Sequence, residues 1–338
     1  MTKDLIVGLV GVGRIGADHA RTISTLKGIK ELVLADLHTE RAEVVAKELG
    51  ARVSTPDDII SEVDVLIIAT PTVDHATHLI AAAEAGVPVF CEKPVALDIE
   101  TTERVRDAVA RTGNLTQIGF MRRFDEGYIN AKRLLQEGAI GKLHRMHVVT
   151  GDFPPPPASY LKGSGYLFKD CTIHDADAIR WVTGKEVDEV FVIGGNLGDP
   201  YFGEEGDIDN GVGVLRLEDG TLVTMQVSRY NAGGYDIRME LAGDKETYSV
   251  GFAEYMAVTS AEPNFTFEQA GERFPNFYPR FIPAYKSEIG AFIETVSNGG
   301  DSLATVEDAL EALYICEALG RSMKENRPVK ISEIRSGN

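Results

Sequence analysis

The sequence of 338 residues predicts an α/β fold in two parts, an N-terminal doubly wound parallel sheet and a C-terminal α+β domain with a large, mostly antiparallel sheet. Apolar runs alternate with stretches of helical periodicity as far as about residue 120, which favours parallel strands joined by crossover helices. After residue 123 the strands become polar and alternating, and turn signals join some of them as hairpins. A chain of this length also exceeds what one hydrophobic core usually holds. We therefore expect one domain over 1–122 and a second over 123–338.

The N-terminal domain is expected to begin with a strand that is buried on both faces, Leu5–Val10. In chain order the other expected elements are a helix at Ala17–Leu26, a strand at Leu32–Ala35, a helix at Thr39–Leu49, strands at Arg52–Val53 and Val63–Ala69, a helix at Val73–Ala85, a strand at Val87–Phe90, a helix at Ile99–Thr112 and a strand at Leu115–Phe120. In such sheets ligands bind beyond the C-terminal ends of the strands. The segments to consider for chemistry are therefore Thr70-Pro71-Thr72, Cys91-Glu92-Lys93-Pro94 and Met121-Arg122-Arg123.

The second domain shows shorter alternating strands. They are expected at Leu143–Val149, Val187–Ile193, Val212–Leu217, Thr221–Arg229 and Arg238–Ala242. A helix at His174–Thr183 interrupts the strands, with Gly184 as its C-cap, and two more helices follow at Tyr285–Ser297 and Val306–Glu325. This pattern indicates an α+β domain built on a mostly antiparallel sheet.

Composition and charge disfavour several classes of protein. The chain is 43% hydrophobic and 25% charged, as in globular proteins, and no apolar run approaches the roughly 18 residues of a membrane span. A net charge of −18 disfavours nucleic acid and anionic membranes as partners, and it suggests a neutral small-molecule substrate. Three scattered cysteines, Cys91, Cys171 and Cys316, argue against a disulfide framework and fit a reducing cytoplasm. Because the first strand follows Met1–Asp4 directly, we expect no signal peptide and a cytoplasmic protein.

The loop after the first strand carries the pattern G-x-G-x-x-G between a strand and a helix, the context of dinucleotide-binding Rossmann folds. Gly11 would permit the tight turn, Gly13 would let the backbone approach a pyrophosphate, and Gly16 would let the helix pack closely on the strand. The first N–H groups of the helix would then point at the phosphates. An ordinary strand-to-helix turn can show the same spacing. The candidate cofactor loop comprises Gly11, Gly13, Arg14, Ile15 and Gly16.

Asp36 ends the next strand, 20 residues after Gly16. An acidic side chain there can accept hydrogen bonds from the adenosine ribose and would repel a 2′-phosphate. We therefore expect NAD as the cofactor in preference to NADP, although Arg41 lies close enough in the sequence to weaken that preference.

Lys93 follows a buried strand and lies between Glu92 and Pro94. Pro94 restricts Lys93 to an extended backbone, which helps fix the direction of its side chain. A lysine at this edge of a nucleotide-binding sheet could bridge the cofactor and a substrate hydroxyl. A solvated loop lysine paired with Glu92 explains the position equally well.

Asp170 and His174 share one helix face if a helix begins by Asp170. A carboxylate beside an imidazole suits proton transfer near neutral pH. A helix cap with a buried, hydrogen-bonded histidine also fits this spacing, and from spacing alone it is the favoured explanation. Binding of a metal by these residues with Asp175 and Asp177 would lack a second histidine, so we expect no metal site.

Four residues have structural expectations. We expect Asp177 and Arg180 to form an i,i+3 pair within one helix, and Trp181 to lie in the core. His75 could contact the nicotinamide, but a capping or exposed position fits it better.

Taken together, the motifs resemble the Gfo/Idh/MocA family, which is named for glucose–fructose oxidoreductase and inositol dehydrogenase. The matching segments are Gly11-x-Gly13-x-x-Gly16, Ala69-Thr70-Pro71-Thr72 with His75, Glu92-Lys93-Pro94, Gly119-Phe120-Met121-Arg122-Arg123-Phe124-Asp125, Gly163-Ser164-Gly165, Asp170-x-x-Ile173-His174-Asp175-x-Asp177 and Ala284-Tyr285-x-x-Glu288. Two of them, Arg122–Asp125 and Ile173–Asp175, resemble the inositol dehydrogenase branch of the family.

The resemblance implies a catalytic set of Lys93, Asp170 and His174. It implies that Thr70, Pro71, His75, Glu92 and Lys93 join the glycine loop and Asp36 in binding NAD, and that Arg122, Asp152, Asp170 and His174 bind the substrate. The implied reaction is NAD-dependent oxidation of a secondary hydroxyl of a cyclic polyol, such as scyllo- or myo-inositol, to a ketone. A homodimer or homotetramer packed through the second-domain sheet is also implied. A pyranose dehydrogenase, an NAD-using glycosidase and a non-catalytic NAD-binding regulator remain as alternatives.

One segment departs from the pattern of that branch. Where inositol dehydrogenases usually read His-Arg-Asn-Pro, or Ser-Arg-Asp-Pro, this chain reads Thr150-Gly151-Asp152-Phe153 before Pro154. The arginine is gone, and Asp152 alone keeps a polar group for a substrate hydroxyl. Since unmatched buried polar groups are costly, we expect this pocket to discriminate differently among polyols.

Overall fold

The structure is a computed structural model of the chain and describes residues 4–252, 256–266 and 272–336. The chain forms two compact units. Unit 1 comprises Met1–Met121 and Pro283–Glu311, and unit 2 comprises Arg122–Ile282 and Ala312–Asn338.

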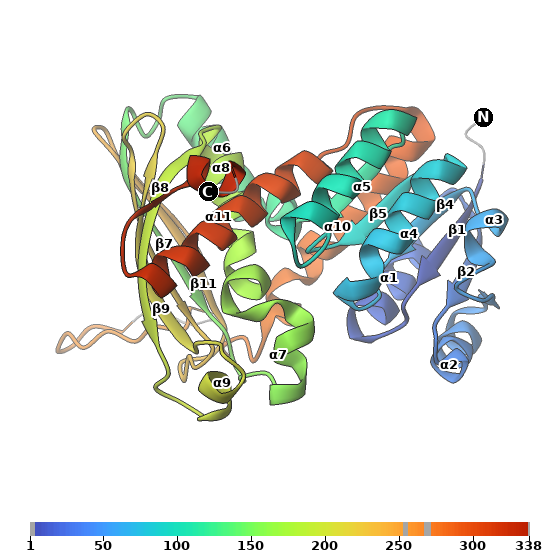
Figure 1. The fold of residues 1–338 in the computed structure, drawn as a ribbon, viewed down its shortest axis with the longest axis horizontal. Coiled ribbons are helices and arrows are strands. Elements are labelled where there is room, and N and C mark those ends of the chain that lie inside the picture. The colour runs from blue at the N-terminus through green and yellow to red at the C-terminus, as the bar shows by residue number, and fades with distance from the viewer. Residues whose placement is uncertain (1–3, 253–255, 267–271, 337–338) are drawn as a thin grey trace. The chain divides into compact units, whose positions relative to one another are not determined.

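Unit 1 contains a six-stranded parallel sheet (Figure 1). Its strands are β1 (Leu5–Val10), β2 (Ile29–Ala35), β3 (Arg52–Val53), β4 (Val65–Ile68), β5 (Val89–Glu92) and β6 (Thr116–Gly119), in the order β3-β2-β1-β4-β5-β6. The connecting helices are α1 (Arg14–Thr25), α2 (Thr39–Leu49), α3 (Ile59–Glu62), α4 (Thr72–Ala85) and α5 (Ile99–Thr112). The predicted doubly wound sheet is therefore confirmed. Its strand order reverses between β1 and β4, the switch point at which such sheets bind ligands.

One face of this sheet packs against α1, α2 and the later part of α10 (Phe277–Asn298). Ile289, Phe292 and Ile293 of α10 lie in the same apolar cluster as Leu9 and Phe90 of the strands. This packing explains why unit 1 includes Pro283–Glu311, which the expected division at residue 122 placed with the second domain. Helical periodicity shows that a segment has an apolar face, but it does not show which sheet that face covers.

Unit 2 contains a seven-stranded sheet. Its strands are β7 (Leu143–Gly151), β8 (Val187–Gly195), β9 (Asn210–Leu217), β10 (Leu222–Ser228), β11 (Asp236–Gly243), β12 (Thr247–Val250) and β13 (Val329–Lys330), in the order β12-β11-β7-β10-β9-β8-β13. All neighbouring pairs are antiparallel except β7 and β10, which run parallel. The predicted mostly antiparallel sheet is therefore confirmed. The short strands β12 and β13 were not foreseen.

The helices of unit 2 outnumber those expected. They are α6 (Glu126–Gln136), α7 (Ala158–Ser164), α8 (Ile173–Thr183), α9 (Tyr201–Glu204), α12 (Ile331–Arg335) and the part of α11 (Val306–Glu325) after Glu311. A π-helical turn, η2 (Phe168–Thr172), leads directly into α8. Asp125 caps α6, because its carboxylate accepts the N–H groups of Gly127 and Tyr128. Sequence reasoning found α8 and α11 but missed α6, α7, α9 and α12.

One structural expectation for α8 was wrong, because Trp181 is only partly buried rather than part of the core, and Lys132 Nζ lies 4.2 Å from its ring centroid. Asp177 has a partner outside the helix in Arg123, whose Nε donates to Asp177 Oδ2 at 3.0 Å. Arg180 donates to Glu186, with 2.7 Å between Nε and Oε2. Arg123 precedes Asp177 by 54 residues, so helical spacing cannot reveal this contact. The pairing of Asp177 with Arg180 stays a prediction.

Candidate functional site

The glycine loop of unit 1 has the geometry that a dinucleotide requires. Gly11 has φ +90°, and a Cβ placed on it would lie 2.5 Å from the backbone N of Thr70. A Cβ on Gly16 would overlap the carbonyl oxygen of Gly11. No atom lies within 4 Å of where a Gly13 Cβ would be, so the backbone there is open to a ligand. These glycines fit the separate tasks of a tight turn, a close helix–strand contact and an approach to pyrophosphate.

Helix α1 begins at Arg14, with Gly13 as its N-cap and no side-chain cap. Its first turn contains no acidic residue that would oppose a phosphate. The N-terminus of a helix without a side-chain cap presents N–H groups to anions. The N–H groups near Arg14 and Ile15 are therefore suited to hold the phosphates of NAD.

The carboxylate of Asp36 lies beside the glycine loop. Its Oδ2 accepts the Val12 N–H at 2.7 Å, and its Oδ1 accepts the His38 N–H at 2.8 Å. A carboxylate oxygen has a second lone pair, so both oxygens remain able to accept ribose hydroxyls. Asp36 therefore orders the loop and presents negative charge at the end of β2.

Removing the charge of Asp36 is expected to weaken the discrimination against NADP. We predict at least tenfold higher kcat/KM with NAD than with NADP in the unmutated protein, a difference of about 1.4 kcal/mol. Asp36→Ala should narrow this ratio but also loosens the contact with Val12. Asp36→Asn keeps an acceptor for Val12 and so isolates the charge. Steady-state kinetics with both cofactors provide the measurement, and equal use of NAD and NADP by the unmutated protein would contradict the role of Asp36.

Two buried histidines of unit 1 hold the loop that carries Lys93. His19 of α1 lies 2.7 Å from Glu92 Oε1 through its Nε2, and its ring packs edge-on against Phe90 and Tyr285. His75 of α4 lies with Nδ1 2.7 Å from the Pro94 carbonyl oxygen. The segment around Lys93 is thus anchored on both sides, by the cofactor helix and by α4.

His75 also reaches the loop after β4, because its Nε2 lies 2.9 Å from the Thr70 carbonyl oxygen. It is 1% exposed, so the expectation of a capping or exposed histidine was wrong. Burial lowers the pKa of His75, while the two carbonyl groups oppose that shift. Its contacts with Thr70 and Pro94 place His75 as a support for two loops at the ligand-binding edge of the sheet. A contact with nicotinamide stays a prediction.

The predicted catalytic carboxylate of unit 2 lies in the π-helical turn η2. Asp170 Oδ2 accepts from Arg229 Nη1 at 2.9 Å, and Asp170 Oδ1 accepts from the Tyr160 hydroxyl at 3.2 Å. Arg229 is 1% exposed and follows the end of β10. π-Helical turns are frequent at functional sites, because they displace a side chain from the regular helical ladder.

His174 lies in the first turn of α8 and is 9% exposed. The next residue, Asp175, is buried, and its Oδ1 accepts from Arg122 Nη1 at 2.5 Å. Thr150 completes a triangle, because its hydroxyl donates to Asp175 Oδ2 at 2.7 Å and accepts from Arg122 Nη2 at 3.2 Å. The guanidinium of Arg122 is thus committed to the segment that carries His174, and its predicted contact with substrate stays a prediction.

The unusual segment after β7 is held by the neighbouring end of β10. Asp152 Oδ2 accepts from Arg229 Nη1 at 3.3 Å, and burial raises the pKa of Asp152. A Cβ on Gly151 would lie 2.8 Å from Asn231 Nδ2, so Asn231 occupies the space beside this glycine. A guanidinium is therefore present beside Asp152 although the segment itself contains no arginine.

Sequence reasoning missed four residues of these arrangements, His19, Thr150, Tyr160 and Arg229. His19 follows Gly16 by three residues on a predicted helix, and this spacing could have indicated it. Arg229 was placed at the end of a predicted strand. Only the parallel pairing of β7 with β10, which the sequence does not reveal, brings it beside Asp152.

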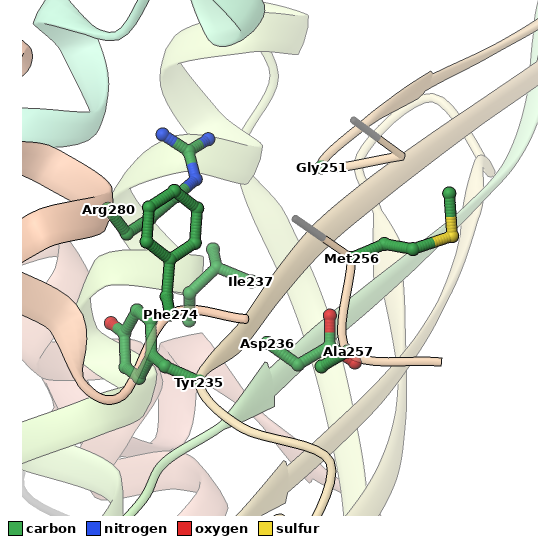
Figure 2. Close-up of a pocket in the computed structure, with 8 residues that line it drawn as sticks. All are labelled: Tyr235, Asp236, Ile237, Gly251, Met256, Ala257, Phe274 and Arg280. Atoms are coloured by element: carbon green, nitrogen blue, oxygen red, sulfur yellow. The ribbon is translucent and has the colours of Figure 1, made fainter. Parts of the chain in front are cut away.

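Unit 2 also contains a small pocket beside β11 (Figure 2). Tyr235, Ile237, Met256, Phe274 and Arg280 are among the residues that line it, and Figure 2 draws them as sticks. None of the residues predicted for catalysis lines this pocket, and we assign it no role.

No group of three or more His, Cys, Asp or Glu side chains in residues 4–252, 256–266 and 272–336 could hold a metal ion. Within the same ranges, no helix has the length and apolar character that crossing a bilayer requires.

Comparisons with known proteins extend over both units. A family model described as "Oxidoreductase family, NAD-binding Rossmann fold" matches residues 5–120, and one described as "GFO/IDH/MocA C-terminal domain" matches residues 128–249. The myo-inositol 2-dehydrogenase of Thermotoga maritima is 33% identical over 97% of this chain and 99% of its own length. The NAD(+)-dependent scyllo-inositol 2-dehydrogenase of Bacillus subtilis is 34% identical over 99% of both chains.

A solved structure shows the same likeness in three dimensions. The scyllo-inositol dehydrogenase from Lactobacillus casei, with bound NAD(H) and scyllo-inositol, superposes with a TM-score of 0.86 at 33% identity over 98% of this chain and all of its own. The match covers both units. The chain belongs to the GFO/IDH/MocA family of oxidoreductases.

Proposed function

We propose that the protein is an NAD-dependent dehydrogenase that oxidises a secondary hydroxyl group of an inositol-like cyclic polyol to a ketone. One observation carries the proposal: the similarity to inositol 2-dehydrogenases extends over 97–99% of the chain and so includes both units. The fit of the glycine loop and Asp36 to NAD supports it independently.

Bound NAD supplies the acceptor for the hydride. His174 is the proposed general base that takes the proton of the substrate hydroxyl, and Asp170 is proposed to orient it. Lys93 is proposed to donate a hydrogen bond to the reacting oxygen and to stabilise the negative charge that develops there. The contacts of Glu92 with His19 and of Pro94 with His75 would hold Lys93 in place for this task.

The charges of unit 2 favour a neutral substrate. Asp152 and Asp170 share a single guanidinium, that of Arg229, so the three groups together carry an excess negative charge. Polyol hydroxyls can donate to these carboxylates, whereas an anionic substrate would be repelled. This local charge agrees with the net charge of −18 for the whole chain.

A screen of inositol isomers and pyranoses for NADH formation tests the proposal. We expect activity with cyclic polyols, and we expect scyllo-inositol, another isomer or a pyranose with an apolar face to exceed myo-inositol in kcat/KM by tenfold or more. The reason is that Gly151 offers no charge-assisted donors, which are worth about 1.5–3 kcal/mol each, and the adjacent Phe153 is 39% exposed.

Asp152→Ala should impair every good substrate in the same screen, because it removes the polar group that this segment offers. The best activity on myo-inositol, or an unchanged kcat/KM in Asp152→Ala, would refute the assignment of specificity to this segment. Release of nitrophenol from nitrophenyl glycosides without net NADH would instead indicate the NAD-using glycosidase.

We further propose that the protein is a cytoplasmic homo-oligomer packed through the sheet of unit 2. Ile193 on β8 and Val212 on β9 are register partners, and they are 59% and 58% exposed. Val214 and Leu222 add exposed apolar surface on neighbouring positions. A patch of this kind favours contact with a second copy. Light scattering at micromolar concentration should show a dimer or tetramer, and a species of 36.7 kDa alone would count against it.

A further inference from the structure

We propose that Arg229 is a positioning residue that holds Asp152 and Asp170 side by side as two ionised carboxylates. This inference rests on the proposed dehydrogenase function, in which Asp170 and Asp152 face the substrate hydroxyls. It adds a residue that the motifs of the family did not indicate.

Three segments that lie far apart in the sequence meet at Arg229. The register of β10 with β7 pairs Ser228 with Gly151, and the Asp152 N–H donates to the Ser228 carbonyl oxygen at 2.8 Å. Arg229 and Asp152 therefore leave the sheet together. Asp170 reaches the same guanidinium from η2. The backbone of Arg229 is fixed by its N–H, which donates to the Asp209 carbonyl oxygen at 2.8 Å.

A single nitrogen of Arg229 serves both carboxylates. Nη1 lies 2.9 Å from Asp170 Oδ2 and 3.3 Å from Asp152 Oδ2, with Cys171 Sγ at 3.0 Å. The other two nitrogens, Nε and Nη2, are buried without a hydrogen-bond partner among the described residues. Burying a guanidinium in this incomplete way costs stability, and apolar side chains of similar volume usually stabilise a core better. The arrangement is therefore better explained by its effect on the carboxylates than by a contribution to folding.

That effect is electrostatic. Two carboxylates that share a site repel each other, which raises the pKa of one of them, and a cation within hydrogen-bonding distance of both opposes this rise. Burial raises the pKa of Asp152, the charge of Asp170 raises it further, and Arg229 lowers it. By reciprocity the charge of Asp152 acts on Asp170 in the same way. Arg229 thus keeps both side chains acceptors of hydrogen bonds, the form that binds substrate hydroxyls.

The test is the pH profile of kcat/KM with NAD and the cyclic polyol that is the best substrate, in the full-length protein. The acidic limb of this profile is the fall in kcat/KM as the pH is lowered. Arg229→Gln removes the positive charge, and we expect the acidic limb to move to higher pH by about 1–3 units. Arg229→Lys keeps the charge, but its shorter side chain does not place the cation where Nη1 lies, so the acidic limb should stay near its original pH while KM rises. Arg133→Gln, on the exposed face of α6, removes an arginine elsewhere in unit 2 and should leave the profile unchanged.

A double variant separates electrostatics from a merely structural role. In Arg229→Gln/Asp152→Asn the carboxylate of Asp152 is removed together with the guanidinium, so the repulsion between the two carboxylates disappears. The acidic limb should therefore return most of the way to its pH in the unmutated protein. If Arg229→Gln does not fold, Asp152→Asn alone remains informative, because loss of the like charge should shift the limb to lower pH. The proposal would be overturned if the acidic limb of folded Arg229→Gln stayed at the pH of the unmutated protein. It would also be overturned if the double variant showed the same acidic limb as Arg229→Gln alone.

Titration of the aspartate carboxyl carbons by ¹³C NMR gives a readout without turnover. In Arg229→Gln at least one of the two carboxyl groups should titrate at higher pH than in the unmutated protein. This measurement separates the two hypotheses, since absence of NADH with every polyol would refute the dehydrogenase function and leave the carboxyl titration to decide the role of Arg229.

Discussion

Replacing His174 by Ala is expected to lower kcat by about 10²–10⁴-fold at every pH tested, the usual contribution of a general base. His174 lies at the start of α8 and is 9% exposed, so truncation of its side chain should leave the fold intact. The affinity for NAD should not change, because the glycine loop and Asp36 belong to unit 1. We would measure kcat by stopped-flow or steady-state kinetics with the cyclic polyol that is the best substrate. Titration with NAD, followed by fluorescence, would measure the affinity for the cofactor.

A matched control for this experiment is His147→Ala. His147 lies on β7, and its Nδ1 is 2.8 Å from the Thr224 hydroxyl, in a contact that the proposed chemistry does not use. Wild-type turnover in His174→Ala over the full pH range would remove His174 from the mechanism. An equal loss in both variants would point to general damage rather than to loss of a base.

Replacing Arg122 by Met is expected to lower the free energy of unfolding by about 3–5 kcal/mol, because it leaves a buried carboxylate without its cation. Arg122 and Asp175 are 2% and 1% exposed in their side chains, so water cannot replace the missing partner. The hydroxyl of Thr150 would remain as a donor to Asp175, but it carries no charge. Denaturant unfolding of unit 2, followed by the fluorescence of Trp181, provides the measurement.

The double variant Arg122→Met/Asp175→Leu should recover much of this loss, because both charges leave the core together. Arg133→Gln, which breaks an exposed pair with Glu137, should cost only about 0.3–0.5 kcal/mol. A cost below 1 kcal/mol for Arg122→Met would show that the buried pair does not support unit 2 as inferred.

The sequence predicted the elements of unit 1 well because they repeat one unit of structure. A parallel strand that is buried on both faces gives a continuous apolar run, as in β4, and the crossover helices show their own period. The expected helices at Thr39–Leu49 and Ile99–Thr112 agree with α2 and α5 to the residue. In unit 2 the alternation located five strands, but their order depends on long-range pairing. The parallel contact of β7 with β10 could not be inferred from their periodicity.

The same distinction applies to the candidate site. Motifs located Lys93, Asp170 and His174, because each belongs to a short local pattern. The contacts around these residues join distant parts of the chain. Arg229 follows its partner Asp170 by 59 positions, and Glu92, the neighbour of Lys93, follows its partner His19 by 73. Arg122 and Asp175 both belong to motifs of the sequence, but neither motif indicates that the two residues pair. Candidate residues in local motifs could thus be proposed from the sequence, whereas the contacts around them required the tertiary structure. Their roles stay predictions.

The return of the chain into unit 1 constrains the order of events during synthesis. Ile289, Phe292 and Ile293 of α10 complete the apolar cluster on one face of the first sheet. A nascent chain that ends at Met121 contains all six strands of that sheet but leaves this face partly open. It must keep an apolar surface exposed while the ribosome makes residues 122–282, which is the period of greatest risk of aggregation. The nucleotide-binding unit therefore closes its core only after most of the second unit has been synthesised, so early termination yields no complete cofactor-binding unit.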